Sequence, residues 1–238
     1  FPIINLVDKF LKKQIFKDFN CYSEESRKLR IWMNGEDTSA PFYPCPKDEL
    51  HKITLGWNIG LNDYRYFGYK LSRLSNYLSY RMYPLTFSTV NKLRGLDVSF
   101  RGTILNHPIA NQRNRVIQLM EKMSKQNADG KRLSKKEYRN ELRNSKLCIS
   151  PYGWGEVCYR DFEIVISGAL LIKPSMEHLS TFPNIYIPNE TYIPVSWSLD
   201  DLAETVECSL ANYDLVKQIA QHGQDVYREA ICKPKSFI

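Results

Sequence analysis

The stretch between residues 146 and 169 constrains the fold of this 238-residue chain more than any other. It starts with an apolar run at residues 146–150, which is typical of a buried strand. A loop with one proline and two glycines follows. Apolar residues then recur at spacings of three and four, as on one face of a helix: Cys158, Phe162, Val165 and Ala169. The sequence therefore predicts a strand, a glycine-rich loop and a helix in direct succession.

This loop and the start of its helix form the predicted functional site. Free backbone N–H groups and the helix dipole favour an anion there, and glycine lets a phosphate come close to the backbone. Arg160 and Glu163 lie three residues apart, so their charged groups can reach the same ligand. We interpret them as part of a nucleotide-sugar site, with Arg160 at the pyrophosphate and Glu163 at the ribose hydroxyls. The alternative is an ordinary surface helix that carries an exposed Arg–Glu ion pair.

Further donor-site candidates come from the loop and from the ends of two other predicted strands. Arg101 follows the strand predicted at residues 97–100, and Lys173 lies near the end of the strand predicted at residues 170–174. The alternatives are a surface or core-flanking arginine and a lysine with a buried stem and a solvated ammonium group. The candidate loop residues are Tyr152, Gly153, Trp154, Gly155 and Glu156.

The pattern S-P-x-G-x-G-x-x-x-x-R-D-x-E at residues 150–163, followed by SGALLIKP at 167–174, resembles the donor half of GT-B glycosyltransferases. It is most similar to exostosin-like and spore-coat CgeB-like members, and small inverting xylosyltransferases of large algal viruses are exostosin-like and about this short. The resemblance covers residues 145–210 well and the first half only in general layout. It implies that Arg160 contacts the donor diphosphate, that Glu163 holds the ribose, and that the donor is a UDP-sugar.

The predicted fold class is α/β, of the GT-B type, with two Rossmann-like domains whose parallel sheets face a central cleft. Strands alternate with helices in two sets, which predicts parallel sheets covered by helices on both faces. The break between the sets falls near residues 84–91. We therefore expect an acceptor-binding domain at residues 1–88 and a donor-binding domain at residues 89–238. The sequence leaves open whether the last helix packs back onto the first domain.

The expected elements outside this stretch follow from periodicity and capping signals. An amphipathic helix is expected at residues 2–19. The expected strands are at residues 29–33, 52–57, 97–100, 170–174 and 193–197, with a further apolar run at 184–187. The expected helices run over residues 111–125 and about 214–231, and capping boxes at 134–137 and 198–201 open two others.

An inverting transfer needs a base that takes the proton of the acceptor. Asp63, in the loop after the strand at 52–57, is the preferred candidate because of its position, with Glu36 second and Asp37 third. Each carboxylate has turn capping as its alternative role. His107 could also serve, although a single loop histidine is more often a bystander. No metal is expected, because the four histidines are isolated and the acidic pair at 200–201 is better explained by helix capping.

The net charge of +7 favours an anionic partner. It keeps two other classes open: a binder of nucleic acid or another polyanion, and a nucleotide-sugar epimerase of GT-B-like fold. The expected partners of the transferase are a nucleotide-sugar donor and a glycan or glycoprotein acceptor. Six cysteines without C-x-x-C spacing are expected to be reduced and mostly buried, as in the cytoplasm. No stretch has the length of a membrane span, and no signal peptide is recognisable.

Overall fold

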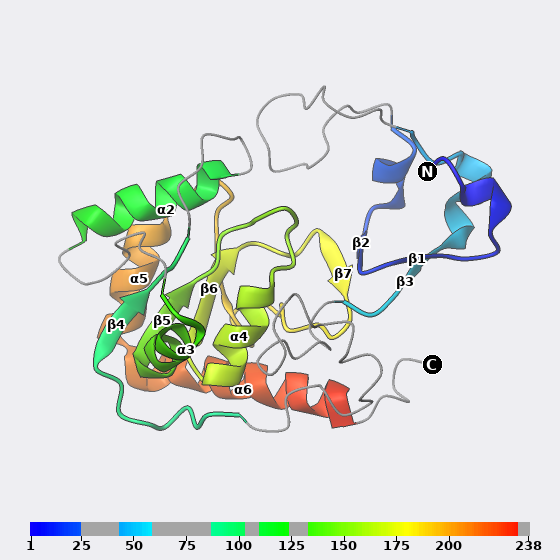
Figure 1. The fold of residues 1–238 in the computed structure, drawn as a ribbon. Coiled ribbons are helices and arrows are strands. Elements are labelled where there is room, and N and C mark those ends of the chain that lie inside the picture. The colour runs from blue at the N-terminus through cyan, green and yellow to red at the C-terminus, as the bar shows by residue number, and fades with distance from the viewer. Residues whose placement is uncertain (25–42, 59–86, 103–109, 124–132, 233–238) are drawn as a thin grey trace. The chain divides into compact units, whose positions relative to one another are not determined.

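The computed structural model describes residues 1–24, 43–58, 87–102, 110–123 and 133–232 (Figure 1). The chain divides into two compact units. One comprises Phe1–Asn58 together with Glu177–Phe182, and the other comprises Ile59–Met176 together with Pro183–Ile238. Each unit is described by itself below.

A four-stranded parallel sheet organises the second unit, in the order β4-β5-β6-β8 (Figure 1). Its strands are β4 (Leu96–Ser99), β5 (Ser145–Ile149), β6 (Leu170–Pro174) and β8 (Ile193–Val195). All five residues of β6 are buried, as their apolar pattern predicts. The predicted α/β class with a parallel sheet is confirmed in this unit.

Within the described residues of this unit, the helices that accompany the sheet are α2 (Asn111–Lys122), α3 (Lys135–Asn144), α4 (Tyr159–Ser167), α5 (Leu202–Ala211) and α6 (Tyr213–Cys232). Alternate residues of β5 and β6, such as Leu147 and Ile172, join a core cluster with α2, α5 and α6. The residues between them, such as Cys148 and Lys173, face the side where α3 and α4 pack. The sheet therefore has helices on both faces, and α6 contacts β6, α4 and α5.

The first unit is built from short elements. Parallel β1 (Phe10–Lys12) and β3 (Ile53–Leu55) form one pair, and antiparallel β2 (Gln14–Phe16) and β7 (Leu179–Thr181) form another. Three short 3-10 helices accompany them: η1 (Ile4–Leu6), η2 (Phe19–Tyr22) and η3 (Lys47–Lys52). Ile4, Tyr22, Cys45 and Ile53 form its small core.

The amphipathic helix expected at residues 2–19 is wrong. The apolar residues at helical spacing lie instead in two short strands, whose side chains are partly buried or exposed. Phenylalanine and isoleucine favour strands, and pairing with β3 and β7 satisfies the backbone groups that a helix would have satisfied internally. Partner strands distant in the sequence therefore override the local pattern.

The capping signals have mixed outcomes. At Ser134 the capping box is present, with Ser134 accepting from the Glu137 amide and Glu137 accepting from the Ser134 amide. The box expected at residues 198–201 is wrong, because α5 begins at Leu202 without a side-chain cap. The Asp201 carboxylate instead accepts from the amide of Ser196 at 2.9 Å, which fixes the turn after β8.

The cysteines only partly follow expectation. All six are free thiols, as expected, but only Cys45 and Cys148 are buried, while Cys208 and Cys232 are exposed. Desolvation raises the pKa of the buried Cys148 thiol to about 12. Among the residues that the structure describes, no helix combines the length and the hydropathy needed to cross a membrane.

Arg94, just before β4, joins the ends of several elements at the amino-terminal side of the sheet. Its buried guanidinium donates to five backbone carbonyls: those of Thr89, Leu142, Arg143, Ser145 and Ser167. Three of them belong to the last turns of α3 and α4, where carbonyl groups lack helical partners and the helix dipole favours a cation. Burial lowers the pKa of this guanidinium, which these carbonyls hold in place.

Replacing Arg94 by leucine should therefore destabilise the second unit. We expect Arg94→Leu to lower the free energy of unfolding by about 2–4 kcal/mol, because buried carbonyls lose a charged donor. Urea unfolding followed by circular dichroism measures the change. Arg115→Leu, at an exposed site on α2, is the matched control and should change stability by less than about 0.5 kcal/mol. Equal effects of the two substitutions would contradict this role of Arg94.

Candidate functional site

The loop between β5 and α4, residues 150–158, lies at the carboxyl ends of the parallel strands, where open α/β sheets bind ligands. Its inner residues are anchored. Tyr152 is fully buried and its hydroxyl donates to the carbonyl of Ser175. The Tyr152 amide donates to the side chain of Gln112 at 3.0 Å, and Gln112 in turn donates to the carbonyl of Trp197 at 2.8 Å. Gln112 of α2 thus connects the loops that follow β5 and β8.

A buried carboxylate, Asp161, organises the loop and the start of α4. Its side chain and that of Lys173 are both 0 % exposed, and the ammonium lies 3.2 Å from the carboxylate. Asp161 also accepts from the Ser150 hydroxyl, from the Tyr186 hydroxyl at 2.7 Å and from the Cys158 amide at 2.9 Å. Because every oxygen has partners, the charge is tolerated in the interior. Desolvation, reinforced by Asp161, raises the pKa of Tyr186, so its hydroxyl stays a donor.

Lys173 is buried, whereas the sequence predicted a lysine at the donor site or one with a solvated ammonium group. Its ammonium group is neither solvated nor at the surface of the loop, but donates to Asp161 and to the carbonyl of Ser150. It also lies 5.0 Å from the ring centroid of Tyr152. Lys173 thus anchors the loop to the interior of the unit through Ser150 and Asp161.

The backbone amides of the loop are less available than the sequence suggests. The Cys158 amide is taken by Asp161, which completes a capping box at the start of α4. The Gly153 amide donates to the carbonyl of Gly155 at 3.1 Å, and the Tyr152 amide is taken by Gln112. A negative side chain already occupies the positive end of the α4 dipole. An anion at this loop must therefore be met mainly by side-chain cations.

Of the two predicted arginines, Arg101 is already neutralised. Its guanidinium pairs with Glu141 of α3 at 2.7 Å, and Glu141 also accepts from the Ser99 hydroxyl. Arg160 is placed differently. It donates to the carbonyl of Arg101 at 3.0 Å, and its guanidinium lies 5.0 Å from the ring centroid of Phe100.

Arg113, in the first turn of α2, is a site residue that the sequence interpretation missed. Its guanidinium lies against Gly153: a β-carbon at that glycine would come within 2.6 Å of Nη2 of Arg113. Desolvation lowers the pKa of Arg113, and repulsion from Arg160 lowers it further. In the part of the chain that the structure describes, neither Arg113 nor Arg160 forms an ion pair, and the buried Nε of Arg113 has no acceptor. Two guanidinium groups without an ion-pair partner therefore lie near one another, and that of Arg113 adjoins the glycine loop.

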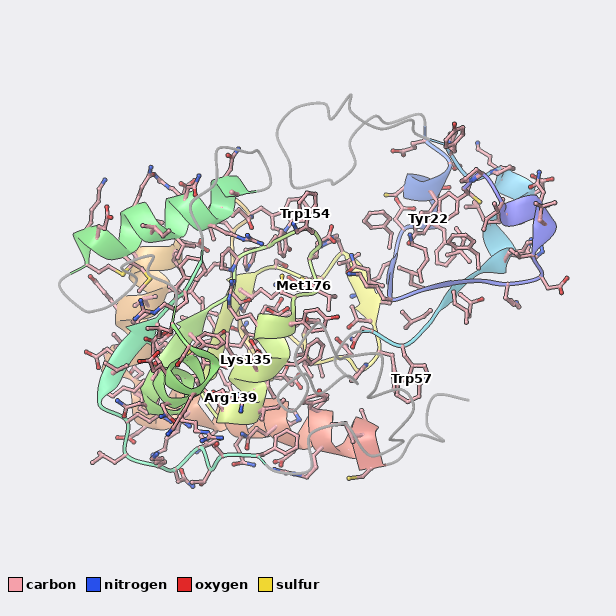
Figure 2. All side chains as sticks on the ribbon, in the orientation of Figure 1. Tyr22, Trp57, Lys135, Arg139, Trp154 and Met176 are labelled. Atoms are coloured by element: carbon pink, nitrogen blue, oxygen red, sulfur yellow. The ribbon has the colours of Figure 1, made fainter. Side chains whose placement is uncertain are left out.

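Glu163 lies one helical turn after Arg160 and faces α3. It accepts from the hydroxyl of Tyr138, and its carboxylate has Arg160, Arg139 and Lys135 as neighbouring cations. Figure 2 labels Lys135 and Arg139 on α3. Burial raises the pKa of the Glu163 carboxyl despite these cations. A largely desolvated carboxylate at this position is suited to accept hydrogen bonds from hydroxyl groups.

The other candidates have separate positions. Glu156 is buried, whereas Trp154 is 73 % exposed (Figure 2). The candidates for the base, Asp63, Glu36 and Asp37, lie outside the described residues, as does His107. Their roles stay predictions.

No family model matches this chain, and no curated protein matches it. Within the described ranges, no group of three or more histidine, cysteine, aspartate or glutamate side chains is placed to hold a metal ion. The functional assignment therefore depends on the geometry of the site.

Removal of one partner of the buried Asp161–Lys173 ion pair should lower the stability of the folded chain. We expect Lys173→Met to lower the free energy of unfolding by about 3–5 kcal/mol, because Asp161 would remain charged without its cation in the interior. Lys146→Met is the matched control on the neighbouring strand, since the Lys146–Asp97 pair has side chains 32 % and 37 % exposed. It should cost less than about 1 kcal/mol. Similar losses in urea unfolding would show that Asp161 does not depend on Lys173.

Glu163 should make stability depend on pH. Its folded pKa is raised above the ordinary 4.5, so the folded chain binds its proton more tightly than the unfolded chain. Its contribution to stability therefore falls as pH rises from 4.5 through the raised value. We expect Glu163→Gln to be more stable than wild type near pH 7 and equally stable near pH 4 by thermal unfolding. Glu207→Gln, at an exposed position on α5, should be as stable as wild type at both pH values. If Glu163→Gln is less stable than wild type near pH 7, the pKa of Glu163 is not raised in the folded chain.

Proposed function

We propose that this chain is a glycosyltransferase that transfers a sugar from a UDP-sugar donor to a glycan acceptor. The observation that carries the proposal is a pair of neighbouring guanidinium groups without an ion-pair partner, that of Arg113 against Gly153 and that of Arg160 next to it, at the carboxyl edge of a parallel sheet. Guanidinium groups bind phosphate oxygens in a fixed, bidentate geometry. The mutual repulsion of these two would be relieved by a diphosphate between them.

The chemistry of the transfer fits such a site. When the bond between the anomeric carbon and the diphosphate breaks, negative charge develops on the leaving diphosphate. Cations held in place beforehand stabilise that charge without reorganising during the reaction. The Asp161–Lys173 pair and the Gln112 bridge hold the loop in this way. Arg160 is further fixed by its bond to the carbonyl of Arg101.

The remaining roles follow from the same proposal. Glu163, on the α3 side of Arg160, would accept from the ribose hydroxyls. Asp63, or else Glu36, would take the proton of the acceptor hydroxyl in an inverting reaction. The GT-B arrangement, with the acceptor bound by the first domain, and xylose as the transferred sugar belong to the proposal as well.

Binding of UDP tests the site through two arginines and a matched control. Isothermal titration should show that Arg160→Ala and Arg113→Ala each weaken UDP binding about tenfold to a hundredfold, since a hydrogen bond to a charged group contributes about 1.5–3 kcal/mol. Arg115→Ala removes the same charge from an exposed position on the helix of Arg113 and should bind UDP like wild type.

Three outcomes separate the candidate functions. Equal loss in all three variants, with a steep salt dependence and competition by single-stranded RNA, would indicate a general polyanion binder. Conversion of the donor into a different sugar without any acceptor would indicate an epimerase. Unchanged UDP affinity in both Arg113→Ala and Arg160→Ala would remove the proposed site.

A further inference from the structure

Trp154 combines a large apolar side chain with high exposure on an otherwise anchored loop. Its side chain is 73 % exposed, whereas Tyr152, Gly153, Glu156 and Val157 around it are buried. An indole left in water forgoes the free energy that burial of its apolar surface would contribute. Figure 2 shows Trp154 on the loop that joins β5 to α4. The loop thus presents an indole face outward from a fixed backbone.

The charged groups near Trp154 follow one another in a fixed succession through the site. Glu163 has Arg160 as its strongest cationic neighbour, Arg160 is a neighbour of Arg113, and Arg113 lies against Gly153, the residue before Trp154. The order along these contacts is therefore carboxylate, two guanidinium groups and the glycine that precedes Trp154. A sugar nucleotide has a matching order of ribose hydroxyls, diphosphate and transferred sugar.

From this order we propose that Trp154 is the stacking platform for the transferred sugar of the donor and thereby a determinant of its specificity. The C–H face of a pyranose ring is apolar, and its hydroxyl groups lie around the rim, so the ring can cover an indole while its hydroxyls stay solvated. Tyr159, 40 % exposed at the start of α4, adds a second aromatic side chain near the same loop. This inference rests on the proposed function, because the diphosphate site sets the direction of the donor.

Titration of UDP and of UDP-xylose tests the proposal on Trp154→Ala, Trp154→Phe and wild type. Trp154→Ala should leave UDP affinity unchanged and weaken UDP-xylose binding about tenfold, the equivalent of about 1.4 kcal/mol of lost stacking. Trp154→Phe, which keeps an aromatic face, should recover most of that loss. Leu215→Ala removes a side chain that is 70 % exposed on α6 and should leave both affinities unchanged.

The outcomes distinguish this inference from the proposed function. If wild type binds UDP but Trp154→Ala weakens UDP and UDP-xylose equally, the indole contacts the nucleotide and the inference is overturned while the donor site stands. The same holds if Trp154→Ala changes neither affinity. If wild type binds neither ligand, the proposed function fails and this inference fails with it.

Discussion

The buried ion pair between Asp161 and Lys173 is the interaction on which the rest of the site depends. It joins the first turn of α4 to the end of β6, and through Ser150, Cys158 and Tyr186 it reaches the end of β5, the loop and the segment before β8. An ion pair of this kind tolerates no missing partner, because either charge alone would remain desolvated. Hydrogen bonds that converge on one carboxylate thus connect the loop to the ends of β5 and β6 and to the start of α4.

The same pair decides how this site can bind an anion. In many strand–loop–helix sites the helix N-terminus itself receives the phosphate. Here the Asp161 carboxylate occupies that end of α4, and three loop amides already have acceptors. Positive charge must come from elsewhere. α2 supplies Arg113 and α4 supplies Arg160, and the bare Cα of Gly153 gives the guanidinium of Arg113 its space.

Local patterns predicted much of the second unit. β5, the loop, α4 and β6 follow from the apolar run, the glycines and the helical spacing, because each element buries a face that its own residues define. The helix expected at residues 2–19 failed because β1 and β2 depend on strands distant in the sequence. The expected box at residues 198–201 failed because Asp201 bonds backward to Ser196.

The site was predicted only in part, for a related reason. Arg113 was missed because its approach to Gly153 depends on how α2 crosses the sheet, which no local spacing records. The sequence patterns assigned no role to Asp161, which lies between Arg160 and Glu163. The signal that could have pointed to it is Lys173, a single charged residue within an otherwise apolar strand, because a buried ammonium group needs an acceptor close by.

A crystal structure of the chain with UDP tests the central claim most directly. The account predicts that the diphosphate lies between Arg113 and Arg160, within about 2.7–3.2 Å of guanidinium nitrogens on both, with the ribose toward Glu163. A diphosphate bound away from both arginines, with Arg113 still packed on Gly153, would contradict it.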